Sequence, residues 1–174
     1  MLNFIDDLEN VICFYTDGSC KGNPGEGGFG VVGFSSKEEI PDATKLDVVV
    51  FHSSSCDYTT NNREELKAIL WTCQLIEEQY QKKKCIIYCD SAYCVNAINS
   101  WMKGWAEKGW INSKKKEVEN KDLFLQLYNY FIIKKLNCQL VKISGHSGIL
   151  GNEMADALAT KNINKFNKLM KEID

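Results

Sequence analysis

The sequence predicts a single α/β domain built on a mixed β-sheet, with its elements in the order β-β-β-α-β-α-α-β-α. Short apolar runs, typical of strands, alternate with longer segments whose apolar residues repeat at helical spacing. A length of 174 residues fits one domain with a sizeable core. Because no repeat, low-complexity tract or linker interrupts the chain, we expect one domain over residues 1–174, with its core at about 11–165.

Three strands are expected first, at Val11–Asp17, Gly28–Phe34 and Leu46–His52. The first of them ends on a carboxylate and is followed by a glycine-rich turn that contains Pro24. The stretch SSKEEIPDATK, between the second and third strands, has the composition of a surface loop. We take the first two strands to form a hairpin, because a tight turn needs glycine at positive φ.

The glycine-rich turn also matches a nucleotide-binding spacing, since Gly25, Gly27 and Gly30 spell G-x-G-x-x-G. That motif holds a phosphate only where a helix follows the turn, and here a strand-like run follows. The sequence G-K-[ST] of a P-loop does not occur in the chain. The turn therefore indicates a hairpin, which leaves the acid Asp17 unexplained.

Four helices and two further strands are expected in the rest of the chain. TTNNREELKAILWTCQLIEEQYQKK begins with N-cap residues, carries acids in its first turn and has apolar residues at helical spacing. CIIYCD is a short apolar strand that again ends on an acid, Asp90, and CQLVKI is a fifth strand. The other helices are expected at SAYCVNAINSWM, which Ser91 would cap, at KDLFLQLYNYFII and at GNEMADALATKNINKF.

Composition narrows the class of protein. The net charge is −2 and the pI about 5.8, so the bulk charge does not favour a nucleic-acid partner and only a local patch could bind one. The chain has no apolar run of 18 residues and no basic leader, so we expect an intracellular protein, cytoplasmic or nuclear, without a membrane partner. Eight cysteines without a C-x-x-C pair indicate buried, reduced thiols and not a zinc site.

Acidic residues stand out at the ends of two strands and at the start of the first helix. Asp17 and Asp90 could each be an ordinary turn or cap residue. A Glu in the first turn of a helix is usually there because it interacts favourably with the helix dipole. Helical projection places Glu65 at the edge of the apolar face and Glu64 almost directly away from the core. Together these positions predict a carboxylate cluster at one edge of the sheet. Bound divalent cations would compensate the repulsion between its negative charges.

A second feature is a basic, tryptophan-rich stretch at about 101–117. From Trp101 to Lys116 it contains five lysines and a single glutamate, interleaved with Trp105 and Trp110, within an acidic protein. Either residue type alone has an ordinary explanation, because lysine runs are usually solvated and tryptophans usually belong to a core. The interleaving of the two favours a nucleic-acid surface.

Five stretches of the chain resemble, in order, the defining motifs of the type-1 ribonuclease H family. They are YTDGSCKGNPGEGGFGVV, TTNNREELKAI, YCDSAYCVNAI, SWMKGWAEKGWINSKKKEVENKDL and GHSGILGNEMADALA, and together they cover about Phe14 to Ala159. The resemblance implies a five-stranded mixed sheet, its first three strands antiparallel, flanked by helices. It also implies metal-dependent cleavage of the RNA strand of an RNA–DNA hybrid within the strand, which leaves 5′-phosphate and 3′-hydroxyl ends.

Matching the motifs residue by residue implies a catalytic set and a substrate-binding set. The implied catalytic residues are Asp17, Glu65, Asp90, His146 and Asp156. The four acids would hold two Mg²⁺ ions, for which Mn²⁺ could substitute, and His146 would aid proton transfer or product release. Backbone around Cys20 would sense the 2′-hydroxyl of RNA. The implied substrate-binding residues are Gly18, Ser19, Cys20, Asn23, Thr60, Asn61, Asn62, Trp101, Lys103, Trp105, Lys114, Lys115 and Lys116.

Two other hypotheses stay open at this point. One is a domain that binds hybrids without cutting them, or a ribonuclease H domain excised from a reverse transcriptase; the complete set of acids argues against a non-catalytic binder. The other is a transposase or integrase core, which the TTNNREEL and GHSGILGNEMAD stretches disfavour. With ten residues before the first strand, we expect no room for a separate hybrid-binding domain. We also expect a free-standing enzyme and a monomer.

Overall fold

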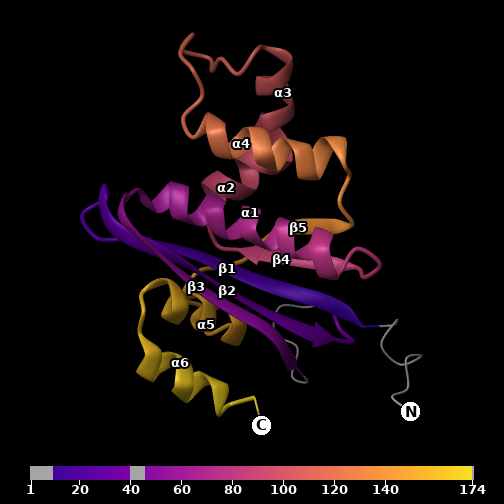
Figure 1. Ribbon diagram of the computed structural model, residues 1–174, viewed down its shortest axis with the longest axis vertical. Helices are drawn as coiled ribbons and strands as arrows, with labels where there is room; N and C mark the ends of the chain where they lie inside the picture. Colours follow the sequence, from indigo (N-terminus) through magenta and orange to yellow (C-terminus); the bar gives the residue numbers. More distant parts are fainter. Residues whose placement is uncertain (1–9, 40–45, 174) are drawn as a thin grey trace.

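The computed structural model describes residues 10–39 and 46–173, and its centre is a five-stranded sheet (Figure 1). The strands are β1 (Val11–Cys20), β2 (Gly25–Ser36), β3 (Asp47–Thr59), β4 (Cys85–Cys89) and β5 (Cys138–Lys142), in the spatial order β3-β2-β1-β4-β5. The first three pair antiparallel, whereas β4 and β5 run parallel to β1. The predicted mixed sheet is therefore confirmed. The predicted loop around Pro41 lies outside the described residues.

The first three strands are longer than the sequence predicts. The ladder between β1 and β2 continues into the glycine-rich segment, where Cys20 pairs with Gly27. At the sheet edge, β3 continues to Thr59, seven residues beyond the expected end at His52. This extension, SSSCDYT, is polar, and its residues alternate between exposed and partly buried positions as far as Asp57. A polar edge strand of this kind lacks the apolar pattern on which sequence prediction depends.

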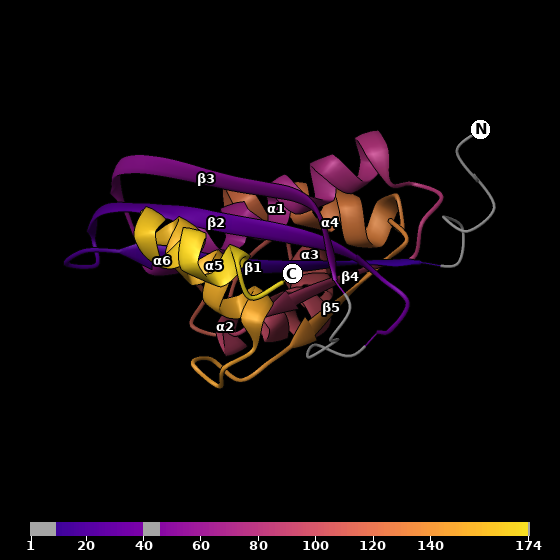
Figure 2. The same ribbon diagram turned by 90° about the horizontal axis from the view of Figure 1, so that it is seen from below.

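Helices cover both faces of the sheet (Figures 1 and 2). On one face lie α1 (Asn61–Gln79), the consecutive segments α2 (Ala92–Asn96), π-helix η1 (Ala97–Trp101) and α3 (Met102–Glu107), and then α4 (Lys121–Tyr128) with π-helix η2 (Asn129–Ile133). On the other face lie α5 (Leu150–Ala159) and α6 (Ile163–Met170). Thr60 and Ser91 cap α1 and α2, as expected.

The last helix is a correction to the sequence prediction, which expected one continuous helix over GNEMADALATKNINKF. The chain leaves the helix after Ala159 and starts a new one at Ile163. The side chain of Asn162 causes the restart, since it accepts a hydrogen bond from the backbone N–H of Lys165 and so caps α6. The helix α6 therefore folds back against α5, to which it is joined by a short turn.

Alternation along β1 divides the core into two layers. Ile12 and Phe14 point towards α1, and Cys13 and Tyr15 point towards α5. Each fully buried Leu, Ile or Phe side chain contributes about 1.5–3 kcal/mol to folding. The eight cysteines are free; five are buried, as predicted, whereas Cys20, Cys56 and Cys138 are partly exposed. Within the described part of the chain, no helix is long and apolar enough to cross a membrane.

Candidate active site

Three carboxylates from separate elements meet at one end of the sheet. Asp17 comes from β1, Glu65 from the first turn and a half of α1, and Asp90 directly follows β4. One ligand atom from each of the three lies within 4.8 Å of the others. Asp17 and Glu65 are buried, and Asp90 is half-buried. Such a concentration of negative charge, largely withdrawn from water, is unfavourable unless protons or cations compensate it.

The sheet and one glycine explain why these side chains meet. The strands β1 and β4 are parallel neighbours in which Thr16 pairs with Cys89, so that the next residue of each chain segment, Asp17 or Asp90, reaches the same edge. Gly18 lets α1 approach β1, because a Cβ at this position would lie 2.3 Å from the backbone nitrogen of Glu65. The Asp17 carboxylate also accepts a hydrogen bond from the N–H of Gly18, at 3.0 Å.

Burial dominates the electrostatics of the cluster. Burial is the largest cause that raises the pKa of Asp17 to about 7, and the nearby charge of Asp90 is the next. Burial also raises the pKa of Glu65 well above its usual value, with the charge of Asp17 as the next cause. The site therefore retains protons near neutral pH while no cation is bound. Three clustered carboxylates, with no imidazole among them, are a donor set that fits a hard divalent cation such as Mg²⁺.

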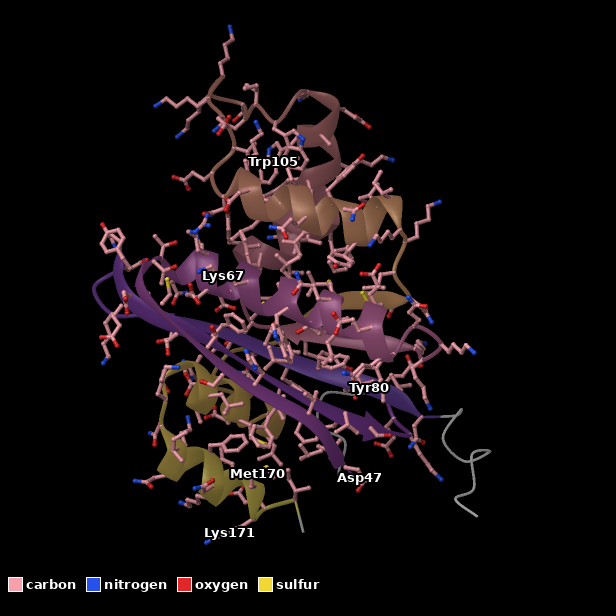
Figure 3. All side chains as sticks on the ribbon, viewed as in Figure 1. Asp47, Lys67, Tyr80, Trp105, Met170 and Lys171 are labelled. Atoms are coloured by element: carbon pink, nitrogen blue, oxygen red, sulfur yellow. The ribbon has the colours of Figure 1, made fainter. Side chains whose placement is uncertain are left out.

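Glu64 is a correction, because it was expected to point almost directly away from the core and is buried. Its side chain is only 1% exposed. Glu64 Oε1 accepts hydrogen bonds from Thr59 Oγ1 at 2.8 Å and from Lys67 Nζ at 2.7 Å, close to the start of α1 (Figure 3). A helical projection takes into account only the apolar face of the helix itself. Glu64 is buried because β3 continues to Thr59 and flanks the first turn of α1. Glu64 thus ties the edge strand to the turn that carries Glu65.

Asp156 lies outside the group of three carboxylates. Helix α5 packs closely on the sheet, because a Cβ at Gly30 or Gly151 would collide with Ala155 or Tyr15. Asp156 Oδ2 accepts a hydrogen bond from Lys165 Nζ at 2.8 Å. The negative charge of Asp156 nevertheless contributes to the raised pKa of Asp17, so the two carboxylates are electrostatic neighbours.

His146 lies in the exposed loop between β5 and α5. Its backbone adopts a left-handed conformation with a φ of 52°. The residue before it, Gly145, is in close contact with the cluster, since a Cβ there would lie 2.8 Å from Asp90 Oδ2. The loop that carries the imidazole therefore starts against a carboxylate of the site, and its tip is open to solvent.

Several residues that are expected to contact the substrate lie around the start of α1. Asn23 Oδ1 accepts a hydrogen bond from the backbone N–H of Asn61, at 3.0 Å, and so joins the glycine-rich turn to the helix. Thr60 Oγ1 caps the helix through the N–H of Arg63. Cys20 Sγ contacts the carbonyl of Thr59 at 3.2 Å. These contacts therefore bring the end of β1, with Gly18 and Ser19, and the glycine-rich turn close to the start of α1, which carries Asn62 and Glu65.

The basic, tryptophan-rich stretch forms a lobe above α4 (Figure 3). Trp101 is half exposed, and its ring lies 5.9 Å from that of Trp105, which packs edge-on against Phe124. An open pocket of about 460 Å³ lies beside these two rings. Trp110 packs against Tyr128, so both Trp105 and Trp110 contribute to the packing beneath the lobe. Lys103 is exposed on α3.

Lys114, Lys115 and Lys116 are exposed on a loop that a single side chain organises. Asn112 Oδ1 accepts hydrogen bonds from the N–H groups of Lys114 and Lys116, at 2.9 and 3.0 Å. Asn112, Glu64 and Lys165 were not singled out as functional from the sequence. The spacing from Glu64 to Lys67 on α1 gives a local signal for one of these contacts, whereas Lys165 is nine residues from Asp156, across a break between two helices.

Comparison with known proteins gives one consistent family. The family model described as RNase H matches residues 9–164. "Ribonuclease H" of Francisella tularensis subsp. novicida (strain U112) is 42% identical over 157 residues, which are 89% of this chain and 92% of that protein. The crystal structure of LC9-RNase H1, described as a type 1 RNase H with the type 2 active-site motif, has a TM-score of 0.70 and 25% identity, covering 89% of this chain and 72% of that one. The foamy viral protease-reverse transcriptase in complex with RNA/DNA hybrid has a TM-score of 0.72, but at 21% identity and 21% coverage of that chain this likeness shows the fold alone.

Proposed function

The chain belongs to the ribonuclease H family, and on this premise we propose that it hydrolyses the RNA strand of RNA–DNA hybrids, leaving 5′-phosphate and 3′-hydroxyl ends. The observation that carries the proposal is the meeting of Asp17, Glu65 and Asp90, which lie within 4.8 Å of one another although 25 to 73 residues separate them along the chain. A protein that only binds hybrids has no need for three carboxylates beside an anionic phosphate, because they repel it.

Asp17, Glu65 and Asp90 would hold the divalent cations, with Asp156 approaching from α5. When bound, two such ions activate the attacking water and stabilise the leaving oxygen of a phosphodiester. We propose Mg²⁺ as the ion, two per site, with Mn²⁺ as a substitute. Since the pKa of Asp17 is raised to about 7, this carboxyl group would release its proton on becoming a ligand. His146, on its open loop, would pass a proton or loosen the product phosphate.

The surface beside the start of α1 would distinguish RNA from DNA. Backbone around Cys20 lies next to Thr59 and the glycine-rich turn. Because glycine has no side chain, the hybrid could approach the backbone closely there. There the backbone can sense the 2′-hydroxyl of the RNA strand. The Asn23–Asn61 hydrogen bond fixes the glycine-rich turn relative to the start of α1. On the lobe, Trp101 would offer a ring for stacking and the three lysines would contact phosphates of the DNA strand.

One assay tests the proposal directly. A labelled RNA–DNA hybrid should be cut in Mg²⁺ and left intact with a chelator, whereas single-stranded RNA, duplex RNA and duplex DNA should resist. Asp17→Asn and Asp90→Asn should nearly abolish cleavage while circular dichroism stays native-like, because a neutral amide cannot balance the cations. Glu77→Gln is the matched control, since it removes a carboxylate of α1 that pairs with Lys134 at the surface. Near wild-type turnover by either site variant would reject the assignment.

A further inference from the structure

We propose that Lys165, on the C-terminal helix α6, competes with the divalent cation for Asp156 and so lowers the metal affinity of the site. The inference rests on the proposed function, in which Asp156 is a ligand. The Lys165 ammonium lies between two carboxylates one turn apart on α5, with Nζ 2.8 Å from Asp156 Oδ2 and 2.9 Å from Glu153 Oε2. It therefore already occupies the place of a positive ion on Asp156.

The fold holds Lys165 in this position. The side chain of Asn162 accepts a hydrogen bond from the backbone N–H of Lys165 and fixes the first turn of α6. The next residue, Phe166, is buried and lies against Phe51 of β3, with ring centroids 5.2 Å apart. These contacts fix the backbone from which the Lys165 side chain reaches the two acids. The side chains of Lys165, Glu153 and Asp156 are each about two thirds or more withdrawn from solvent, which limits screening of the ion pairs by salt.

Asp156 connects this ion pair to the carboxylate cluster. Its charge acts on Asp17, so a cation that neutralises Asp156 reduces the negative potential that would attract a metal ion. For an ammonium and a divalent cation that share one carboxylate, roughly 6 Å apart in a solvent-like dielectric, Coulomb's law gives about a tenfold effect on affinity. Lys165 lies one residue beyond the range 9–164 that the family model matches, so membership of the family does not supply this contact.

Isothermal titration of Mg²⁺ into the hybrid-free protein tests the proposal without any cleavage readout. Lys165→Met should bind Mg²⁺ about three- to tenfold more tightly than the wild type, and Lys165→Arg, which keeps the charge, should remain close to it. The matched control is Lys168→Met, because Lys168 is exposed on the same helix and makes no ion pair with any described residue. This control removes the same charge and should change the affinity less than twofold.

A double-mutant cycle shows whether Lys165 acts through Asp156. Asp156→Asn should weaken Mg²⁺ binding, and Lys165→Met should have little effect in that background. The proposal is overturned if Lys165→Met leaves Mg²⁺ affinity unchanged or weakens it, if Lys168→Met matches its effect, or if the effect persists without the Asp156 carboxylate. Lys165→Gln provides a second neutral variant if Lys165→Met unfolds.

Failure of this inference and failure of the proposed function give different results. If the wild type does not cut hybrids while Lys165→Met still binds Mg²⁺ more tightly, only the substrate assignment is wrong. If the wild type cuts hybrids and its metal affinity is independent of Lys165, only the competition is wrong.

Discussion

Gly18 of β1 lies directly against the backbone of Glu65 in α1, so closely that a Cβ on Gly18 would be 2.3 Å from the Glu65 nitrogen and 2.7 Å from the Glu64 carbonyl carbon. We therefore expect Gly18→Ala to push α1 away from β1. Because backbone and not a flexible side chain is in the way, the substitution should destabilise the fold by about 1–3 kcal/mol or more. It should also move Glu65 relative to Asp17 and reduce cleavage at least tenfold in the fraction that stays folded.

Urea unfolding followed by circular dichroism measures the first effect, and cleavage under conditions where the variant is folded measures the second. Gly104→Ala is the stability control, because a Cβ at Gly104 meets nothing within 4 Å and alanine favours a helix by about 1 kcal/mol over glycine. That control should be as stable as the wild type or more so. Wild-type stability of Gly18→Ala would contradict the close packing of α1 on β1.

Asp17 should make the cation-free protein less stable as the pH rises. Its pKa is raised from 3.8 to about 7 in the folded state, chiefly by burial. Between about pH 4 and pH 7 the folded protein then binds more protons here than the unfolded chain does, so the stability contributed by this group decreases with pH and is lost above about pH 7. Asp17→Asn cannot ionise, and in chelator at pH 8 it should exceed wild-type stability by an amount on the order of a few kcal/mol.

The measurement is urea unfolding of both proteins in chelator at pH 5 and pH 8. The advantage of Asp17→Asn should be partial at pH 5, which lies inside the window from about pH 4 to pH 7, and reach its full size at pH 8. Mg²⁺ at pH 8 should then reverse the order, since the wild type alone keeps its full set of ligands. An advantage that does not change between the two pH values would show that Asp17 titrates near its ordinary pKa.

The features of this protein that arise from local sequence patterns could be predicted, whereas those that depend on contacts between distant residues could not. The ends of β1 and β4 could be placed because apolar runs stop at Asp17 and Asp90, and the parallel pairing of these strands does the rest. The edge of the apolar face of α1 likewise placed Glu65 correctly towards the sheet. These are signals of local periodicity, and they do not depend on a partner elsewhere in the chain.

The missed features depend on partners distant in sequence. Glu64 is buried because β3 extends to Thr59, and that polar edge strand has no apolar alternation that would predict its length. Lys165 reaches Asp156 only because Asn162 starts a new helix that folds back on α5. A helical projection treats each helix alone, so it cannot report a side chain that a strand or a second helix covers.

Lys114, Lys115 and Lys116 should contribute to binding more than to the chemical step. Changing all three to alanine should raise KM much more than it lowers kcat, because the loop that Asn112 organises lies on the lobe, away from the carboxylates. Each lost phosphate contact should flatten the dependence of log K on log salt by roughly 0.7–0.9. Hybrid binding measured from low to moderate salt, and steady-state kinetics, give the two quantities.

The control for the lysine loop removes the same charge elsewhere. Lys82, Lys168 and Lys171 are exposed and lie outside the lobe, so their joint replacement by alanine tests the effect of net charge alone. That variant should keep most of the salt slope. A slope unchanged by loss of Lys114, Lys115 and Lys116 would mean that this loop is only a solvated surface.

His146→Ala should remain folded, active and dependent on Mg²⁺, with kcat reduced more than KM is changed. The imidazole lies on an exposed loop, and its neighbour Gly145 lies close to the carboxylate of Asp90. General acid–base assistance is typically worth about 10²–10⁴-fold, and an auxiliary group should contribute at or below the lower end of that range. Removal of this side chain should therefore cost far less than Asp17→Asn.

Pre-steady-state kinetics of His146→Ala can separate the two roles open to this side chain. If the imidazole loosens the product phosphate, the variant should show a burst of cleavage followed by slow turnover, because release has become limiting. If it passes a proton, the single-turnover rate itself should fall and no burst should appear. The open position of the loop is compatible with either role, since an exposed imidazole can exchange protons with water and approach a departing phosphate. Loss of activity as deep as that of Asp17→Asn would contradict both and make His146 an essential base or ligand.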